Sequence, residues 1–201
     1  MIDLFLKGGP LMYPLLLGSV ISLALILERG LCLLRSRTNR RKIEEIKELV
    51  QGNAYERAAS EVEGLAGPVA SLCAMVLRSR DMSLPELEKE ISLAGSRKLK
   101  ALNRNLHILE LIGKISPMVG LFGTVLGLAR TFQTVAQLKR MANPALLASG
   151  IWEALITTVA GLFIGIPAII FYHLYDNRAR SIAFEMRTYA EEFISHVKEN
   201  E

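Results

Sequence analysis

The sequence ALLASGIWEALITTVAGLFIGIPAIIFYHL, residues 145–174, carries one charged side chain, Glu153. At a rise of about 1.5 Å per residue, a helix of this length is longer than the ~30 Å hydrocarbon core of a bilayer. Tyr172 and Tyr175 lie where an interfacial aromatic belt belongs, and Arg178 follows them. The stretch therefore predicts a helix that crosses a membrane.

Two further stretches have the same character. Residues 115–138 contain Arg130 as their only charge, and residues 11–27 contain none. A helix over residues 11–27 would be roughly 25 Å long, which is shorter than the hydrocarbon core. It therefore needs a flanking group such as Arg29, whose apolar stem allows its charge to reach water. A cleavage site of the kind that follows a secretory signal peptide is not seen after it. Three membrane-spanning helices are predicted.

Composition agrees with this division but does not decide it. The 201 residues are 51% hydrophobic and 22% charged, with a net charge of +4 and a mean hydropathy of +0.30. Basic residues gather from Arg35 to Lys42, without a zinc-finger or helix-turn-helix pattern that would indicate nucleic acid. Positive flanks mark the cytoplasmic side of membrane helices, so we expect the N-terminus outside and the C-terminus in the cytoplasm.

Between the first and second stretches the chain is polar, with helical periodicity. Apolar residues recur at three- and four-residue spacing along residues 43–50 and 69–76. Ser83 and Glu86 have the spacing of a capping box. No proline or turn cluster interrupts residues 86–115, so we expect one helix to enter the membrane from the cytoplasm without a break.

These patterns predict an all-α membrane protein with three transmembrane helices, two of them very long and extending into the cytoplasm. The expected parts are an N-terminal segment with the first transmembrane helix (1–34), a cytoplasmic helical region (35–112), the second transmembrane helix (113–140), a short outer loop with the third (141–176) and a cytoplasmic helical tail (177–201). Asn143 suits the N-cap of the third helix, and Pro144 suits its first position.

Small residues recur along the second and third stretches. Small residues let helix backbones approach closely in lipid. We therefore expect a packing role for Gly120, Gly123, Gly127, Gly161 and Gly165. Pro117 and Pro167 each leave a carbonyl without its helical N–H partner and are expected to kink their helices.

Glu153 is the residue most expected to act chemically. A carboxylate within a membrane stretch costs roughly 2.5–3.5 kcal/mol, so it normally faces protein or water. It could instead lie among the outer headgroups beside Trp152, or pair with Arg130, which is otherwise a snorkelling anchor. Hydroxyls in these stretches either line a polar pathway or bond to carbonyls of their own helix; the candidates are Thr124, Thr157 and Thr158.

The sequence offers no constellation for catalysis. Cys32 and Cys73 lack the spacing of metal ligands and are expected to be free thiols. The three histidines are scattered, and there is no nucleophile–base pair, phosphate-binding loop or suitable carboxylate pair. We therefore expect no enzyme activity, no catalytic residue, no metal and no cofactor.

Two stretches resemble those of a known family. ISPMVGLFGTVLGL, residues 115–128, is similar to the second-span motif of the MotA/TolQ/ExbB proton-channel family, closest to its ExbB/TolQ branch. EALITTVAGLFIGIPA, residues 153–168, is similar to the third-span motif. The motifs are similar over about residues 108–176. In the rest of the chain only the layout is similar, with three spans and a large polar section between the first two.

The resemblance implies a homopentamer of long helices around a dimer of a small single-span partner similar to ExbD or TolR, whose membrane helix carries an aspartate. Such an assembly is a stator-like proton channel in the bacterial inner membrane. It turns proton-motive force into work on the cell envelope, as in TonB/ExbB/ExbD or Tol systems, and a protein similar to TonB or TolA can receive that work. By position, Thr124 and Thr158 would line the lumen opposite the aspartate, and Glu153 would lie at the outer end of the third span.

Three alternatives share these features. A non-conducting oligomeric membrane scaffold would use the same small residues for packing. A sodium-driven subunit would differ in its partner's carboxylate site. A flagellar-type stator subunit is less similar, since that branch typically has four spans and a larger cytoplasmic region. The polar section between the first two spans is small for this family, and Lys114 is a cation near the expected inner mouth. Both features depart from the pattern and leave the choice among Ton, Tol and other systems open.

Overall fold

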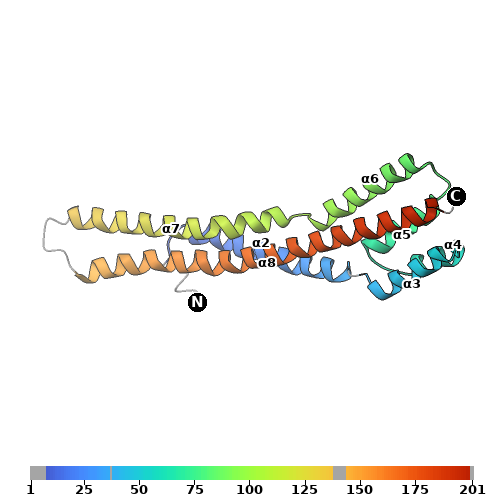
Figure 1. The fold of residues 1–201 in the computed structure, drawn as a ribbon. Coiled ribbons are helices and arrows are strands. Elements are labelled where there is room, and N and C mark those ends of the chain that lie inside the picture. Colours follow the sequence, from blue (N-terminus) through green and yellow to red (C-terminus); the bar gives the residue numbers. More distant parts are fainter. Residues whose placement is uncertain (1–7, 37, 138–143, 200–201) are drawn as a thin grey trace. The chain divides into compact units, whose positions relative to one another are not determined.

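The computed structural model describes residues 8–36, 38–137 and 144–199, and within these ranges it contains helices and no strand. The helices are α2 (Met12–Arg35), α3 (Arg40–Gln51), α4 (Tyr55–Glu63), α5 (Pro68–Arg78), α6 (Leu84–Leu102), α7 (Leu106–Gln137) and α8 (Pro144–Glu199) (Figure 1). Three segments are long and apolar enough to cross a membrane: Met12–Gln51, which contains α2, Leu84–Gln137, which contains α7, and Leu147–Lys198, which lies within α8. The predicted fold class is confirmed.

The chain divides into two compact units. The first unit comprises Met1–Glu28 and Asn105–His173, and the second comprises Arg29–Arg104 and Leu174–Glu201. The helices α2 and α8 therefore contribute residues to both. The two units differ in the kind of surface they expose, which shows what solvent each one is built for.

The first unit exposes apolar side chains along all of its helices. More than half of the side chain surface is accessible at many of them, including Leu17, Val20, Leu23, Met118, Leu121, Val125, Val159, Phe163 and Ile166. A soluble domain rarely exposes a contiguous apolar surface of this extent, whereas lipid requires one. The first unit is thus the membrane-embedded part of the chain.

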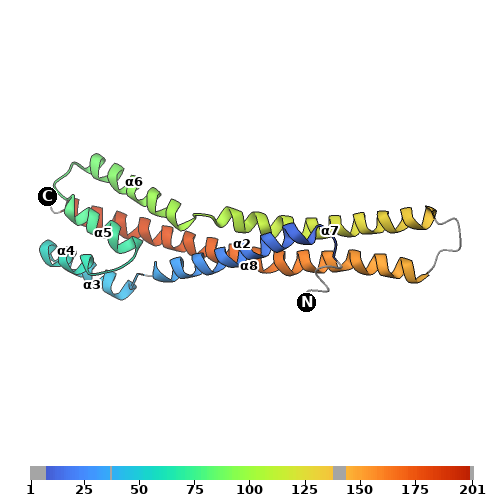
Figure 2. The same cartoon turned by 180° about the vertical axis from the view of Figure 1, so that it is seen from behind.

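The second unit has an apolar core of its own. The predicted stripes of α3 and α5 are buried in it, together with one face of α8, and the core includes Ile43, Ile46, Val50, Val69, Leu72, Val76, Leu87, Ile182 and Phe193. At its edge the Tyr189 hydroxyl donates to Glu44 at 2.8 Å, and Lys47 pairs with Glu192 at 3.0 Å. These contacts join α3 to the C-terminal part of α8. Figure 2 shows the ribbons of both helices from behind.

Residues 86–115 do not form the single uninterrupted helix that the sequence predicted. The helix α6 ends at Leu102, and Asn105 has a φ of +61° before α7 begins at Leu106. Asparagine tolerates this left-handed conformation because its short polar side chain bonds locally. The break therefore arises from an Asn-Arg-Asn sequence without glycine or proline.

Two predictions about local contacts also differ from the structure. Ser83 occupies the N-cap of α6, but its hydroxyl donates to the Glu86 carboxylate at 2.6 Å and caps no backbone N–H, so the capping box is incomplete. Arg29 does not snorkel: it is buried and donates to the Ala101 carbonyl at 3.2 Å. Pro144 is the first residue of α8, as predicted, and Asn143 lies outside the described residues.

Both cysteines are free, as predicted. Cys73 is fully buried in the core of the second unit, and this burial raises the pKa of its thiol to about 12. Since the thiolate is the reactive form, we expect iodoacetamide to leave Cys73 unmodified in the folded chain at neutral pH and to label it after unfolding in denaturant. Peptide mass spectrometry measures both rates, and rapid labelling of the folded protein would contradict the buried position.

A matched pair of phenylalanines on α8 tests the core of the second unit. Phe193 is fully buried, whereas Phe184 is 71% exposed. We expect Phe193→Ala to destabilise this unit by about 3–5 kcal/mol because it leaves a cavity, and Phe184→Ala to change stability by only about 0.5 kcal/mol. Hydrogen exchange of the α3 and α5 amides in the full-length protein measures the difference. Equal effects would show that the core is packed differently.

Candidate functional site: the seam between α7 and α8

In the first unit, α7 and α8 lie antiparallel and meet along a line of small residues (Figure 1). A Cβ atom added to Gly120 would lie 2.9 Å from the Thr157 carbonyl oxygen and 3.0 Å from the Thr158 Cα. One added to Gly127 would lie 2.8 Å from the Ala154 Cβ. The two backbones therefore approach so closely that side chains larger than hydrogen do not fit at these positions.

Gly161 and Gly165 take part in the same seam from α8. A Cβ on Gly161 would lie 3.0 Å from the Gly120 Cα, and one on Gly165 would lie 2.6 Å from the Pro117 Cδ and 2.9 Å from the Gly113 carbonyl oxygen. Gly113 is the residue whose carbonyl Pro117 leaves without a helical donor. Gly165 thus makes room for both the proline ring and the carbonyl that the proline frees.

Gly123 and Pro167 complete the set of small and kink-forming residues chosen from the sequence. A Cβ on Gly123 would lie 2.8 Å from the Thr157 Cβ, so this glycine also faces α8. Pro117 lies inside α7 and Pro167 inside α8. That the two prolines kink their helices stays a prediction.

The three candidate threonines make three different hydrogen bonds. Thr158 Oγ1 donates across the seam to the Gly120 carbonyl at 3.0 Å. Thr124 Oγ1 donates to the Leu121 carbonyl of its own helix at 2.6 Å. Thr157, which is only 2% exposed, donates to the Gly8 carbonyl at 3.0 Å. Only Thr124 therefore uses its hydroxyl solely within its own helix.

Glu153 lies beside a small pocket in the first unit. The pocket has a volume of about 30 Å³ and is also lined by Thr157, Arg130 and the turn at residues 8–11. The turn approaches closely, since a Cβ on Gly9 would lie 3.3 Å from Glu153 Oε1. Arg130 and Glu153, both in the described part of the chain, form no direct ion pair although they line the same pocket.

Lys114, the cation that the sequence placed near the inner mouth, pairs with Glu110 one turn earlier on α7. Both residues belong to the first unit. The pair has i,i+4 spacing, which brings the two side chains to the same side of the helix. A local partner therefore offsets the charge that looked out of place in the sequence.

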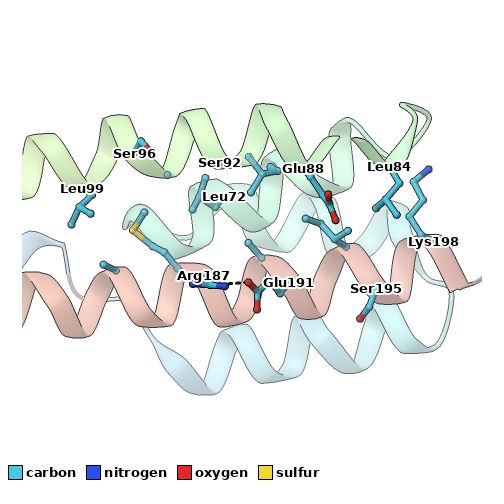
Figure 3. A pocket seen from close by; sticks show the side chains of 16 residues that line it. Leu72, Leu84, Glu88, Ser92, Ser96, Leu99, Arg187, Glu191, Ser195 and Lys198 are labelled. Carbon is cyan, nitrogen blue, oxygen red and sulfur yellow. Dashed lines mark hydrogen bonds and ion pairs between the residues drawn. The ribbon is translucent and has the colours of Figure 1, made fainter. Parts of the chain in front are cut away.

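The second unit contains a groove that the sequence did not reveal. It has a volume of about 840 Å³ and runs between α6 and the C-terminal part of α8, with Leu72 of α5 among its lining residues (Figure 3). Charged side chains line it as well, among them Glu88 and an Arg187–Glu191 ion pair of 2.7 Å. The groove lies between helices that are far apart in sequence, so the periodicity of any one helix could not predict it.

Comparison with known proteins identifies the family. The profile of the MotA/TolQ/ExbB proton channel family matches residues 68–188, and the chain belongs to this family. Similar proteins include the Tol-Pal system protein TolQ of Haemophilus influenzae, which is 30% identical over 210 residues, 96% of this chain and 91% of that protein. These findings confirm the resemblance seen in the sequence.

Two further relatives cover less of their own length. The Tol-Pal system protein TolQ of Pseudomonas aeruginosa is 38% identical over 113 residues, 56% of this chain and 48% of that protein. The biopolymer transport protein ExbB of Pseudomonas putida is 34% identical over 182 residues, 86% of this chain and 53% of that protein. The chain thus spans about half the length of these two proteins. The names TolQ and ExbB agree with the predicted branch of the family.

The seam predicts a large effect of one methyl group. Gly120→Ala places a Cβ against the backbone of α8, which cannot yield as a flexible side chain would. We expect a loss of about 1–3 kcal/mol, the usual penalty for overpacking, and a lower melting temperature of the full-length protein in detergent. Gly18→Ala is the control, because its Cβ would meet nothing closer than 3.8 Å. Equal melting temperatures for the two variants would contradict the close approach of α7 and α8.

Proposed function

We propose that this chain is the proton-channel subunit of a motor in the bacterial inner membrane, which turns proton-motive force into work on the cell envelope in a Tol- or TonB-type system. Membership of the family supports this proposal, and so does the position of Glu153. A carboxylate in a membrane-spanning helix is costly to place in lipid, so it normally faces protein or water and often marks a proton or ion pathway. Here it borders a pocket that contains other polar groups.

The proposal requires a partner. Along residues 115–138 and 145–174, Glu153 is the only carboxylic acid, and a relay along these spans needs at least one more group that takes and releases protons. We propose that this group is the membrane aspartate of a dimeric single-span protein similar to ExbD or TolR. Five copies of this chain would surround the dimer, and a protein similar to TonB or TolA would receive the work.

Each polar residue has a proposed role in this assembly. Thr124 and Thr158 would line the lumen opposite the partner's aspartate, where hydroxyls can accept and donate hydrogen bonds along a narrow pore. Glu153 would act at the outer end of the third span, with Thr157 beside it. The N-terminus would lie outside and the C-terminus in the cytoplasm, as the basic residues after the first span favour.

The scaffold alternative uses the seam but not the polar groups. Close packing of α7 and α8 needs the glycines, whereas a scaffold has no use for a carboxylate beside a polar pocket, which favours the channel. A sodium-driven subunit would keep the same seam and differ in the partner's ion site. A flagellar-type stator subunit is disfavoured because the described residues contain three candidate spans, and that branch typically has four.

The double variant Thr124→Val, Thr158→Val tests the channel when assembly is checked beside it, because the Thr158 hydroxyl also links α8 to α7. We expect the double variant to lose proton flux by roughly 30-fold, because each substitution removes a hydroxyl that contributes one hydrogen bond of about 1 kcal/mol. The flux is measured with a pH dye in liposomes that contain the chain and the small single-span protein encoded beside it. Thr134→Val is the control, since Thr134 is exposed and bonds to the Arg130 carbonyl of its own helix at 3.0 Å.

Native mass spectrometry of the same samples shows whether assembly persists. A pentamer that takes up two copies of the partner, with flux lost in the double variant, supports the motor. Full assembly with unchanged flux in the double variant would favour the scaffold. Failure of the wild-type chain to take up any single-span partner would contradict the proposed motor.

A further inference from the structure

Polar side chains join α3 to the C-terminal part of α8 at one constant spacing in the second unit. Every contact links residues that are 145 positions apart in sequence. We call this set the polar ladder, and its rungs are Arg40–Glu185, Glu44–Tyr189, Lys47–Glu192 and Gln51–His196. A constant spacing means that the two helices run parallel in a single register, and the rungs recur with the seven-residue repeat of a coiled coil.

Two rungs are ion pairs that are only partly exposed to water. The Glu185 side chain, which pairs with Arg40, is 13% exposed. The Lys47 side chain, whose Nζ lies 3.0 Å from Glu192 Oε2, is 23% exposed. Salt screens partly buried charges less than fully exposed ones, so the sign of the charge opposite each of these side chains matters.

The other two rungs are hydrogen bonds. The Tyr189 hydroxyl donates to Glu44 at 2.8 Å. Burial, with Glu44 as a further cause, raises the pKa of Tyr189 to about 12, so the hydroxyl keeps the proton that it donates. The Nε2 atoms of Gln51 and His196 lie 3.2 Å apart. The ladder thus combines charged and neutral contacts, and each depends on which residue stands opposite.

The apolar contacts between these helices do not select one register. The buried face of α8 in this unit repeats at three- and four-residue spacing, with Ala179, Ile182, Met186, Ala190, Phe193 and Val197. A shift of α3 by one turn therefore leaves its buried isoleucines facing other apolar side chains. Cores tolerate such exchanges when volume and patterning are kept, so burial alone permits several registers.

The polar residues do discriminate, as the position of Glu44 shows. A shift of three residues along α8 towards its C-terminus would place Glu44 opposite Glu192, and a shift of four towards the N-terminus would place it opposite Glu185. The other one-turn shifts would place it opposite Phe193 or Met186. Like charges repel, and an apolar neighbour gives a carboxylate no donor. Every one-turn shift therefore replaces a favourable rung with an unfavourable contact.

We propose that the polar ladder, rather than the apolar core, fixes the register of α3 on α8 and makes the two helices move together. The helix α8 is continuous from Pro144 to Glu199, so α3 is attached to the same helix that carries Glu153 and Thr158. A displacement of the C-terminal part of α8 along its axis would then displace α3 as well. This inference concerns contacts within the second unit and does not depend on the proposed motor.

Double electron–electron resonance of the full-length chain in lipid bilayers tests the register. Spin labels are placed at Glu48→Cys on α3 and Ser181→Cys on α8, which are both exposed and outside the ladder. Cys32→Ser removes the more accessible native thiol, and Cys73 remains because it is fully buried. An excess of unlabelled chain suppresses distances between copies. A one-turn shift moves the labels by about 5 Å along the helix axis, which the method resolves.

We expect a single distance between the labels when the ladder is intact. Arg40→Glu together with Lys47→Glu reverses the charge on one side of two rungs, so the original peak should be lost and replaced by distances that differ by about 5 Å. Adding Glu185→Arg and Glu192→Lys restores opposite charges at both rungs, and the original peak should return.

A matched control comes from another ion pair of the same unit. Arg78 and Glu63 pair at 2.7 Å between α5 and α4, outside the ladder, with 68% and 49% of their side chains exposed. Arg78→Glu also reverses one charge, and we expect it to leave the distance unchanged.

Two outcomes would overturn the proposal. An unchanged distance in the charge-reversed variant would show that the apolar core fixes the register. A changed distance that the restoring substitutions fail to reverse would show that the ladder residues do not determine the register as a set of pairs. Return of the original peak separates a shift of register from a general folding defect, because a defect caused by the first two substitutions would not be repaired by two more.

Discussion

The contact between the backbones of α7 and α8 is the constraint on which the membrane-embedded unit depends. Lipid provides no hydrophobic drive for two apolar helices to associate, so close van der Waals contact and interhelical hydrogen bonds must supply it. The facing glycines at 120 and 161 provide the contact, and the bond from Thr158 to the Gly120 carbonyl provides the polar link. The register of α7 against α8 determines which residues Thr157 and Glu153 face.

The two units meet opposite demands with one kind of secondary structure. The first unit turns its apolar side chains outward and places small and polar residues between its helices. The second unit buries large apolar side chains such as Phe193 and Ile43 inside, and exposes ion pairs such as Arg78–Glu63. In water, burial of apolar area holds helices together, whereas in lipid close fit does, which is why the glycines matter in one unit and the large aliphatic side chains in the other.

The sequence predicted the parts of this structure that depend on local periodicity. The three apolar stretches are continuous runs long enough to span a bilayer. The small residues of α7 and α8 and the buried stripes of α3 and α5 recur at helical spacing, which indicates the face of the helix that packs. The helix break at Asn105 was not predicted, because asparagine tolerates the left-handed backbone conformation but does not require it. The bond from Thr157 to Gly8 and the groove beside α6 both bring together residues that are distant in sequence. Such contacts cannot be predicted from the periodicity of a single sequence.

The three threonines of the site differ in whether their hydroxyls also hold parts of the fold together. In lipid a hydroxyl must find an acceptor inside the protein, and each of these hydroxyls has found a different one. Thr158 and Thr157 donate to other segments, so removing either hydroxyl also removes a tie between elements of the fold. Thr124 donates only to its own helix and remains partly exposed. A loss of proton flux at Thr124 would therefore report on the pathway itself, whereas the same loss at Thr158 would combine the pathway with the seam that positions it.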